Sequence, residues 1–309
     1  MRIFVAGHRG MVGSAMVRAL EKRGGVTVLA QTRQQLDLTD PGAVDRWFAK
    51  EKPEQVVDAA ARVGGIGENS RKPVEFLLDN LRIQNNLLES AFRHGCKKFL
   101  FLGSSCIYPK HAPQPIPEES LLTGPLEPTN DAYALAKITG IRLALAYRDE
   151  YGKSAIAAMP TNLYGPGDNF DPETSHALPG MITKFHRAKQ RGEKEVVLWG
   201  SGTPRREWLH VDDLAAGLLV LLDKYDAREI VNVGVGEDLT IRELAEKVKK
   251  AVGFSGAIRW DSGKPDGTPR KLLDVTRIRK LGWQPTISVE QGIASTYAWF
   301  LQNAPEART

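Results

Sequence analysis

Residues 2–13 read RIFVAGHRGMVG, an apolar run that passes directly into a glycine-rich turn. The run predicts a buried strand, and the apolar spacing that begins at Met11 predicts a helix. The glycines at positions 7, 10 and 13 allow a tight turn, close approach of an anion to the backbone, and close packing of helix on strand. Because a helix N-terminus attracts anions, this unit predicts a dinucleotide pyrophosphate site, on a GxxGxxG spacing.

Apolar runs and helical stretches alternate through the first half of the chain, a pattern typical of a parallel sheet covered by helices on both faces. The fold class we predict is α/β, with a Rossmann-type doubly wound parallel sheet whose ligands collect at the carboxyl ends of the strands. Strands are expected at 2–6, 26–30, 55–59, 98–102 and 155–159, and helices at 11–22, 41–50, 74–94 and 132–151.

The sequence changes character after Pro160, where glycine, proline and polar residues become frequent. We expect a dinucleotide-binding domain over 1–163, to which the chain returns around 207–235, and a smaller α/β substrate-binding domain over 164–309. The later elements expected are a strand at 230–233 and helices at 211–222, 240–252 and 288–302, with Asp212, Thr240 and Ser288 as N-caps.

The composition is that of an ordinary globular protein, with 42% hydrophobic and 26% charged residues among 309. No stretch approaches the roughly 18 apolar residues of a membrane span. The chain enters a strand at once, so we expect no signal peptide and a cytoplasmic protein. Two cysteines and six histidines show no zinc spacing, so no metal is expected. The net charge of +5 fits either a solvated surface or a cleft that collects phosphates, and no basic motif predicts nucleic-acid binding.

The end of the second predicted strand indicates which dinucleotide is bound. Enzymes that use NAD usually present an acidic residue there for the ribose 2′-hydroxyl. Here residues 28–33 read VLAQTR, with no acid before Asp37. Arg33, together with Arg9 in the glycine loop, can pair with a 2′-phosphate through charge-assisted contacts. We therefore predict NADP(H) as the cofactor and place Asp37 in the loop near the adenine.

Tyr133 and Lys137 stand four residues apart, on one face of a predicted helix. A nearby ammonium, with the positive charge of an oxidised nicotinamide, is expected to favour the tyrosine phenolate. Tyr133 can then exchange a proton with a substrate oxygen while hydride moves at the adjacent carbon. Ser104 and Ser105 end the fourth predicted strand, where their hydroxyls can bind the same oxygen.

A serine followed by Tyr-x-x-x-Lys, after a GxxGxxG loop, resembles the extended short-chain dehydrogenase/reductase family over essentially the whole chain. Four further segments are similar to the nucleotide-sugar 3,5-epimerase/4-reductases of that family, which act on GDP-4-keto-6-deoxy-D-mannose with NADPH. These segments are LGSSCIYP at 102–109, MPTNLYGP at 159–166, WGSGTPRRE at 199–207 and KPDGTPRK at 264–271. The resemblance also implies a homodimer formed by the 74–94 helix and the Tyr133 helix, although a core-facing 74–94 helix fits the sequence too.

The resemblance implies a role for each residue of the site. Cys106 would be the base at C3 and C5 if the site makes it a thiolate, and His176 the opposing acid, because a pKa near 6.5 lets it hold a proton. Ser104, Tyr133 and Lys137 would serve the reduction. The implied cofactor contacts are Gly7, His8, Arg9, Gly10, Met11, Val12, Gly13, Arg33, Asp37, Leu38, Leu102, Gly103, Ser104, Ser105, Lys137, Pro160, Asn162, Leu163 and His176. The implied substrate contacts are Lys184, Trp199, Arg206, Asp266 and Lys271.

Two alternatives remain open on the sequence. Another nucleotide-sugar enzyme of the same family is one, although a 4-epimerase that retains NAD should show an acid after the second strand. A dehydratase needs carboxylates where Ser105 and Cys106 stand. The other alternative is a protein that senses NADP(H) and regulates a partner without catalysis. Such proteins can lose the Tyr and Lys that this chain has.

Overall fold

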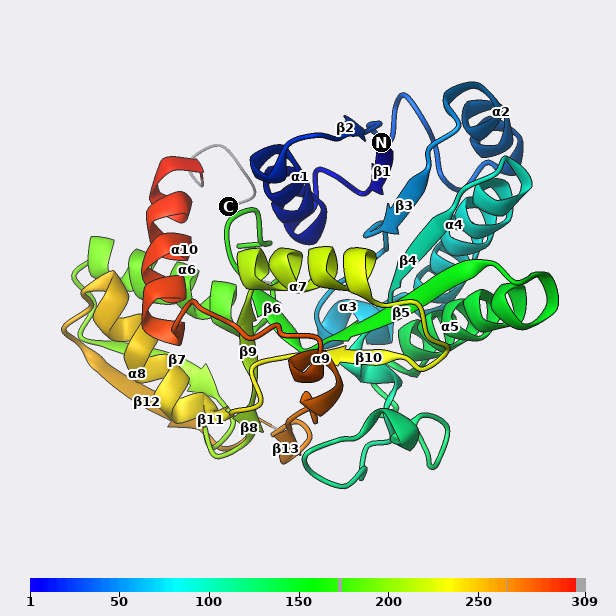
Figure 1. Cartoon of the computed structure of the whole chain (residues 1–309). Helices are drawn as coiled ribbons and strands as arrows, with labels where there is room; N and C mark the ends of the chain where they lie inside the picture. Colours follow the sequence, from blue (N-terminus) through cyan, green and yellow to red (C-terminus); the bar gives the residue numbers. More distant parts are fainter. Residues whose placement is uncertain (172–173, 265, 304–309) are drawn as a thin grey trace.

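Six parallel strands form the central sheet of the protein (Figure 1). The structure is a computed structural model that describes residues 1–171, 174–264 and 266–303. The strand order is β10-β5-β4-β3-β1-β2, so the chain starts one strand in from an edge, adds β2 at that edge and then extends the sheet in the other direction. The strands are β1 Arg2–Ala6, β2 Thr27–Leu29, β3 Gln55–Asp58, β4 Lys98–Leu102, β5 Ser154–Pro160 and β10 Val231–Val233. The predicted fold class is confirmed.

Two groups of helices pack around this sheet. Helix α1 (Met11–Arg23) packs against α7 (Val211–Lys224), while α4 (Pro73–Arg93) packs against both α5 (Asp131–Tyr151) and α2 (Pro41–Glu51). Right-handed crossovers put α1 on one face and α2, α4 and α5 on the other, because the chain moves across the sheet in opposite directions from β1. All of these strands end at the same edge, where the site lies.

Most of the remaining elements gather at the other end of the molecule (Figure 1), whereas α3 packs against α4 and α9 packs against β10 of the central sheet. Helices α6, α8 and α10 enclose a second buried apolar cluster with β7 and β9, apart from the cluster around the sheet. The boundary between the two domains, which we place between residues 163 and 164, stays our proposal. These elements are α3 Ile66–Arg71, β6 Asn162–Tyr164, α6 Ala177–Gln190, β7 Glu195–Trp199, β8 Arg205–Arg206, β9 Trp208–His210, β11 Leu239–Thr240, α8 Ile241–Val252, β12 Ala257–Asp261, β13 Arg270–Lys271, α9 Thr276–Lys280 and α10 Val289–Asn303, with short 3-10 turns at Ser105–Ile107 and Glu118–Ser120.

Two of the three predicted N-caps are found. Thr240 forms a capping box with Glu243, and the Ser288 hydroxyl accepts from the backbone N–H of Gln291 at 3.3 Å. The prediction for Asp212 is wrong. Strand β9 runs directly into α7, so His210 is the extended residue before the helix, and its Nδ1 accepts from the Asp212 N–H at 3.3 Å.

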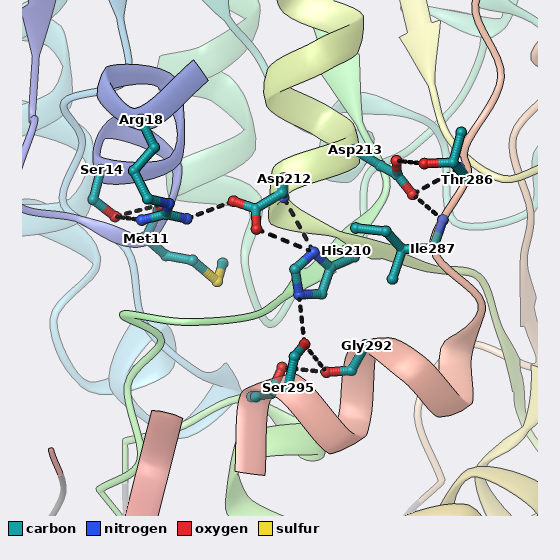
Figure 2. A network of polar contacts seen from close by, with 11 residues as sticks. Met11, Ser14, Arg18, His210, Asp212, Asp213, Thr286, Ile287, Gly292 and Ser295 are labelled. Atoms are coloured by element: carbon teal, nitrogen blue, oxygen red, sulfur yellow. Dashed lines mark hydrogen bonds and ion pairs between the residues drawn. The ribbon is translucent and has the colours of Figure 1, made fainter. Parts of the chain in front are cut away.

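His210 is the centre of a polar network that joins three helices (Figure 2). The Asp212 carboxylate, in the first turn of α7, pairs with Arg18 of α1 at 2.5 Å. On its other side, His210 Nε2 lies 3.3 Å from the hydroxyl of Ser295 in α10. The network therefore connects the helix that follows the glycine loop to the helix near the end of the chain. In the described ranges, no helix is long and apolar enough to cross a membrane.

Candidate active site

The glycine loop has the geometry of a pyrophosphate cradle. Gly7 has φ +78°, and a Cβ there would lie 2.8 Å from the carbonyl oxygen of Ala59. A Cβ on Gly13 would lie 2.1 Å from the oxygen of Gly7, so both positions exclude any side chain. Gly10 is the N-cap of α1, and no side chain caps this helix. The first N–H groups of α1 are thus left for an anion, and the loop fits the pyrophosphate of a dinucleotide.

Two arginines, one in the glycine loop and one after β2, are the predicted partners of a ribose 2′-phosphate. The loop passes close to the end of β2, since the His8 imidazole hydrogen-bonds the backbone at Gln31. Arg9 and Arg33 are both exposed, and neither forms an ion pair with a carboxylate of the described residues. Asp37 instead accepts from the N–H and hydroxyl of Thr39 at 2.9 and 2.7 Å, which lowers its pKa. The carbonyl of the neighbouring Leu38 accepts from Asn86 at 2.9 Å. The arginines therefore fit the extra phosphate of NADP(H).

We expect Arg33→Ala to lower the preference for NADPH over NADH in kcat/KM by about 10- to 100-fold. Loss of a charge-assisted pair with the 2′-phosphate costs about 1.5–3 kcal/mol for NADPH and nothing for NADH. Arg46→Ala, an exposed arginine on α2, should leave the preference unchanged. An unaltered preference in Arg33→Ala would show that another group selects the cofactor.

The carboxyl end of β4 and the start of α5 bring the predicted reductive residues together. Ser104 is extended at the start of the first 3-10 turn, and its hydroxyl accepts from the Cys106 N–H at 3.2 Å. One turn of α5 separates Tyr133 from Lys137, whose ammonium donates to the carbonyl of Leu102 at 2.8 Å. Lys137 Nζ also lies 5.9 Å from the centre of the Tyr133 ring. Tyr133, Ser104 and Lys137 thus lie around one point.

The Tyr133 phenol keeps its proton in this structure. Burial raises its pKa well above the ordinary value of 10.0, the nearby Cys106 raises it further, and a hydrogen bond with Ser104 acts weakly in the opposite direction. Lys137 was expected to favour the phenolate, but its ammonium is committed to the Leu102 carbonyl and does not reach the hydroxyl. The expectation also included the charge of a bound oxidised nicotinamide, so it stays a prediction. A protonated phenol suits a residue that must give a proton to a substrate oxygen.

A buried carboxyl that the sequence reading missed lies near Lys137. Asp58 ends β3, is fully buried, and accepts from the Ala60 N–H at 3.2 Å through one oxygen. The other oxygen has no partner among the residues described. Burial raises the pKa of Asp58 to about 6, and the charge of Lys137 opposes this rise. A charged residue within an apolar strand was the signal that could have revealed it.

Cys106 lies between two hydrogen-bond donors. The Asn130 amide nitrogen is 3.4 Å and the Lys271 ammonium 3.5 Å from its sulfur. Burial alone would raise the pKa of the thiol, but the charge of Lys271 and the hydrogen bonds of Ser104, Lys271 and Asn130 outweigh burial, and the pKa is lowered. Its surroundings therefore favour the thiolate form that the sequence requires of Cys106 as a base.

His176 precedes α6 as its N-cap residue, and its side chain is exposed. Although part of the imidazole faces solvent, the protein atoms around it disfavour the charged form and lower its pKa from 6.5, and the charge of Lys271 lowers it further. That His176 holds a proton at working pH therefore stays a prediction, which needs an anion bound nearby. Lys271, which the sequence placed with the substrate, thus acts on both groups predicted for epimerisation.

The predicted substrate residues form a line of contacts that starts at Cys106. Lys271 of β13 is paired in register with Arg206 of β8. The charge of Asp266 acts on Arg206, and its carboxylate also accepts from the N–H and hydroxyl of Ser201 at 2.9 and 2.7 Å. Two residues before Ser201, the Trp199 indole is 68% exposed.

Cations flank the exposed indole at the far end of this line. Lys184 of α6 and Lys264 each place Nζ 5.5 Å from the Trp199 ring centre. Lys184, with Arg187 and Arg191, also lines an open hollow of about 300 Å³ between α6 and β7. The other predicted contacts, Pro160, Asn162 and Leu163, lie at the end of β5 and in β6, where the Asn162 amide donates to the carbonyl of Glu207 at 2.8 Å.

The protein combines a doubly wound sheet, a glycine loop before a helix that no side chain caps, and a serine followed by Tyr-x-x-x-Lys. Together these features define a nucleotide-dependent oxidoreductase of the short-chain dehydrogenase/reductase class. The model of the NAD dependent epimerase/dehydratase family matches residues 3–234. The chain belongs to this family.

The relatives to which the chain is similar include several proteins named GDP-L-fucose synthase. GDP-L-fucose synthase 1 of Arabidopsis thaliana is 56% identical over 302 residues, which are 98% of this chain and 94% of the plant protein. GDP-L-fucose synthase of Escherichia coli K12 is 51% identical over 318 residues, 99% and 98% of the two chains. The crystal structure of a GDP-L-fucose synthetase from Naegleria fowleri bound to NADP has a TM-score of 0.91 at 33% identity and covers 100% of this chain and 96% of that one. These likenesses extend over both ends of the molecule.

A second buried carboxyl, Asp168, gives a stability prediction. One of its oxygens accepts from the Asn169 N–H at 2.7 Å and the other has no partner in the described structure. Burial raises its pKa to about 7 from 3.8. The folded state therefore favours the protonated form, and stability is lost as the pH rises from about 4 to about 7.

Asp168→Asn should remove this loss, because the amide cannot ionise. We expect the free energy of unfolding of the variant to exceed that of the wild type by little near pH 4 and by about 4 kcal/mol at pH 8. Urea denaturation at the two pH values measures the difference. The exposed Glu237→Gln is the control. An equal effect of Asp168→Asn at both pH values would contradict the assignment.

Proposed function

We propose that the protein epimerises C3 and C5 of GDP-4-keto-6-deoxy-D-mannose and then reduces C4 with NADPH, to give GDP-L-fucose. The observation that carries the proposal is the position of Cys106. A plain reductase needs only the tyrosine, lysine and serine, whereas here a sulfur with two hydrogen-bond donors lies beside that set. The identity to GDP-L-fucose synthases over nearly the whole chain supports the same reaction.

The epimerisation uses Cys106 and His176. The 4-keto group makes the hydrogens on C3 and C5 acidic, so a thiolate at Cys106 can remove each as a proton. His176 returns a proton from the opposite face, which inverts the carbon. In the free protein, burial and the charge of Lys271 lower the pKa of this imidazole. The diphosphate of the bound substrate, an anion, raises its pKa towards the protonated form that this step needs.

The reduction uses the residues at the end of β4 and the start of α5. NADPH, when bound, supplies hydride to C4. Tyr133 donates its proton to the C4 oxygen. Because the pKa of the phenol is raised, the proton moves only as the oxygen gains negative charge. Ser104 hydrogen-bonds the same oxygen and holds it in place. Lys137 donates to the Leu102 carbonyl beside the tyrosine ring, and its remaining N–H groups would hydrogen-bond the nicotinamide ribose.

The line of contacts from Lys271 to Trp199 suits a nucleotide diphosphate. Arg206 and Lys184 bind the diphosphate, and the exposed Trp199 packs against the base or its ribose. Asp266 orders the turn at Ser201 that carries this surface and neutralises part of the charge of Arg206.

The decisive experiment is incubation of the purified protein with NADPH and GDP-4-keto-6-deoxy-D-mannose. Consumption of NADPH with formation of GDP-L-fucose, identified by NMR, is the expected result. A regulatory protein that senses NADP(H) would bind the cofactor without turnover. A 4-epimerase or dehydratase would consume no NADPH, and a plain 4-reductase would give a product with C3 and C5 unchanged.

We also propose that the protein is a cytoplasmic homodimer. Helices α4 and α5 pack side by side and expose Val74, Leu78, Leu135 and Tyr151, of which Val74 is 66% and Leu135 46% exposed. Pairing of these two helices with those of a second copy would cover this apolar surface. Leu135→Glu should then shift the mass measured by analytical ultracentrifugation from two chains to one.

A further inference from the structure

We propose that Lys271 and Asn130 are positioning residues that hold the sulfur of Cys106 as a thiolate, Lys271 through its ammonium and Asn130 through its amide. The inference rests on the proposed function, in which Cys106 is the base of the epimerisation. It adds two residues to that step, neither of which is needed for hydride transfer.

Asn130 is the N-cap residue of α5, a position where asparagine usually accepts a hydrogen bond from the helix backbone. Here its side chain makes no such bond. The amide nitrogen donates instead to the Cys106 sulfur at 3.4 Å. The amide oxygen is buried without a partner in the part of the chain that is described. The side chain therefore contacts the sulfur and does not stabilise the start of the helix as a cap.

Lys271 is the cation that is free for the sulfur. The small pocket beside Cys106, of about 50 Å³, is lined by three basic residues. Lys110 pairs with Glu127 at 3.1 Å, and Arg270 pairs with Asp238. Lys271 forms no ion pair with a carboxylate of the described residues, and its ammonium lies 3.5 Å from the sulfur.

Among the described residues around Cys106, no other group supplies a free positive charge. From α5, Tyr133 presents a phenol whose pKa is raised by burial, and at the start of α6 burial and Lys271 lower the pKa of His176, which disfavours its charged form. The Lys110–Glu127 pair is neutral overall, and Thr268 donates to Glu127 at 3.4 Å. The net positive charge at the sulfur thus comes from Lys271. An opposite charge at this distance lowers the pKa of a thiol by about one unit or more, consistent with the direction found for Cys106.

The test is the pH dependence of Cys106 alkylation by iodoacetamide, measured by mass spectrometry on the full chain with and without saturating NADP⁺. Only the thiolate reacts, so the rate reports the pKa of the thiol. Cys96 does not interfere, because it is buried and burial raises its pKa to about 12. Cys106→Ser identifies the labelled site. The variants are Lys271→Met, Lys271→Arg and Asn130→Ala, with Lys110→Met as the matched control from the same pocket.

We expect Lys271→Met to move the alkylation midpoint up by about one pH unit or more. Asn130→Ala should move it less, and Lys271→Arg and Lys110→Met should leave it near the wild-type value. Equal midpoints in wild type and Lys271→Met, or an equal shift in Lys110→Met, would overturn the proposal. The wild type alone also tests the proposal, so the test remains possible if Lys271→Met fails to fold. An alkylation midpoint of the wild type at or above that of an ordinary cysteine would overturn the proposal.

This measurement needs no sugar nucleotide, so it is independent of the proposed function. A wild-type protein that has a reactive thiolate but exchanges no deuterium at C3 or C5 would disprove the function and leave the roles of Lys271 and Asn130 intact. With substrate, the acidic limb of the pH profile for C3/C5 exchange should move up in Lys271→Met by the same amount as the alkylation midpoint. A purely structural effect would lower the rate at all pH values.

Discussion

Cys106→Ser should abolish measurable exchange of the substrate's C3 and C5 hydrogens with solvent deuterium while NADPH binding persists. A positioned acid or base contributes about 10²- to 10⁴-fold to a proton transfer, and a serine hydroxyl at this position is far too weak a base to replace a thiolate. The glycine loop and the arginines that fit NADPH are unchanged in this variant. Incubation in deuterium oxide followed by NMR, with NADPH binding measured by fluorescence, tests both halves of this result.

The companion variant His176→Asn should lose exchange too, because the proton must return from the opposite face of the ring. Cys96→Ala is the control, since that sulfur is buried and donates to the carbonyl of Lys98 at 3.2 Å, away from the site. Exchange at the wild-type rate in both Cys106→Ser and His176→Asn would remove these two residues from the mechanism.

The second large effect concerns the reduction. Tyr133→Phe removes the proton donor and should slow NADPH oxidation by about 10²- to 10⁴-fold. Deuterium exchange at C3 and C5 should continue, because Cys106 and its two donors are untouched. The variant therefore separates the two reactions and should accumulate epimerised 4-keto sugar. Rapid-quench kinetics with product analysis by NMR measures this separation.

Tyr147→Phe, on the same helix, should reduce at the wild-type rate. If Tyr133→Phe loses exchange and reduction together, the phenol also takes part in epimerisation. If it loses neither, Tyr133 is not the proton donor.

The sheet and its motifs could be predicted from the sequence because their signals are local. The run before Gly7 and the apolar run of β4 are continuous, as expected of strands covered on both faces, and both are found where predicted. The family predicted from the motifs is confirmed by the match over residues 3–234. The predicted use of NADP(H) agrees with the NADP-bound relative from Naegleria fowleri.

The second half was harder to predict because its elements depend on distant partners. Helix α6 was missed altogether, although Pro179 in its first turn is a position where proline is tolerated. Strands β7 and β12 pair with each other across about sixty residues of chain, so neither is evident alone. The roles of individual site residues stay predictions. Asn130 was missed as a partner of Cys106 because an asparagine before a helix is normally a cap.

The network around His210 has a mechanical consequence. Arg18 lies on α1, which packs in the apolar cluster around the sheet, and Ser295 lies on α10, which packs in the second apolar cluster, and the two are joined through only two intervening side chains (Figure 2). The Arg18–Asp212 pair is half-exposed, and exposed ion pairs contribute only about 0–1 kcal/mol. The network therefore connects the helix of the glycine loop to the second apolar cluster through side chains that can separate at little cost, so small shifts of α1 need not disturb α10.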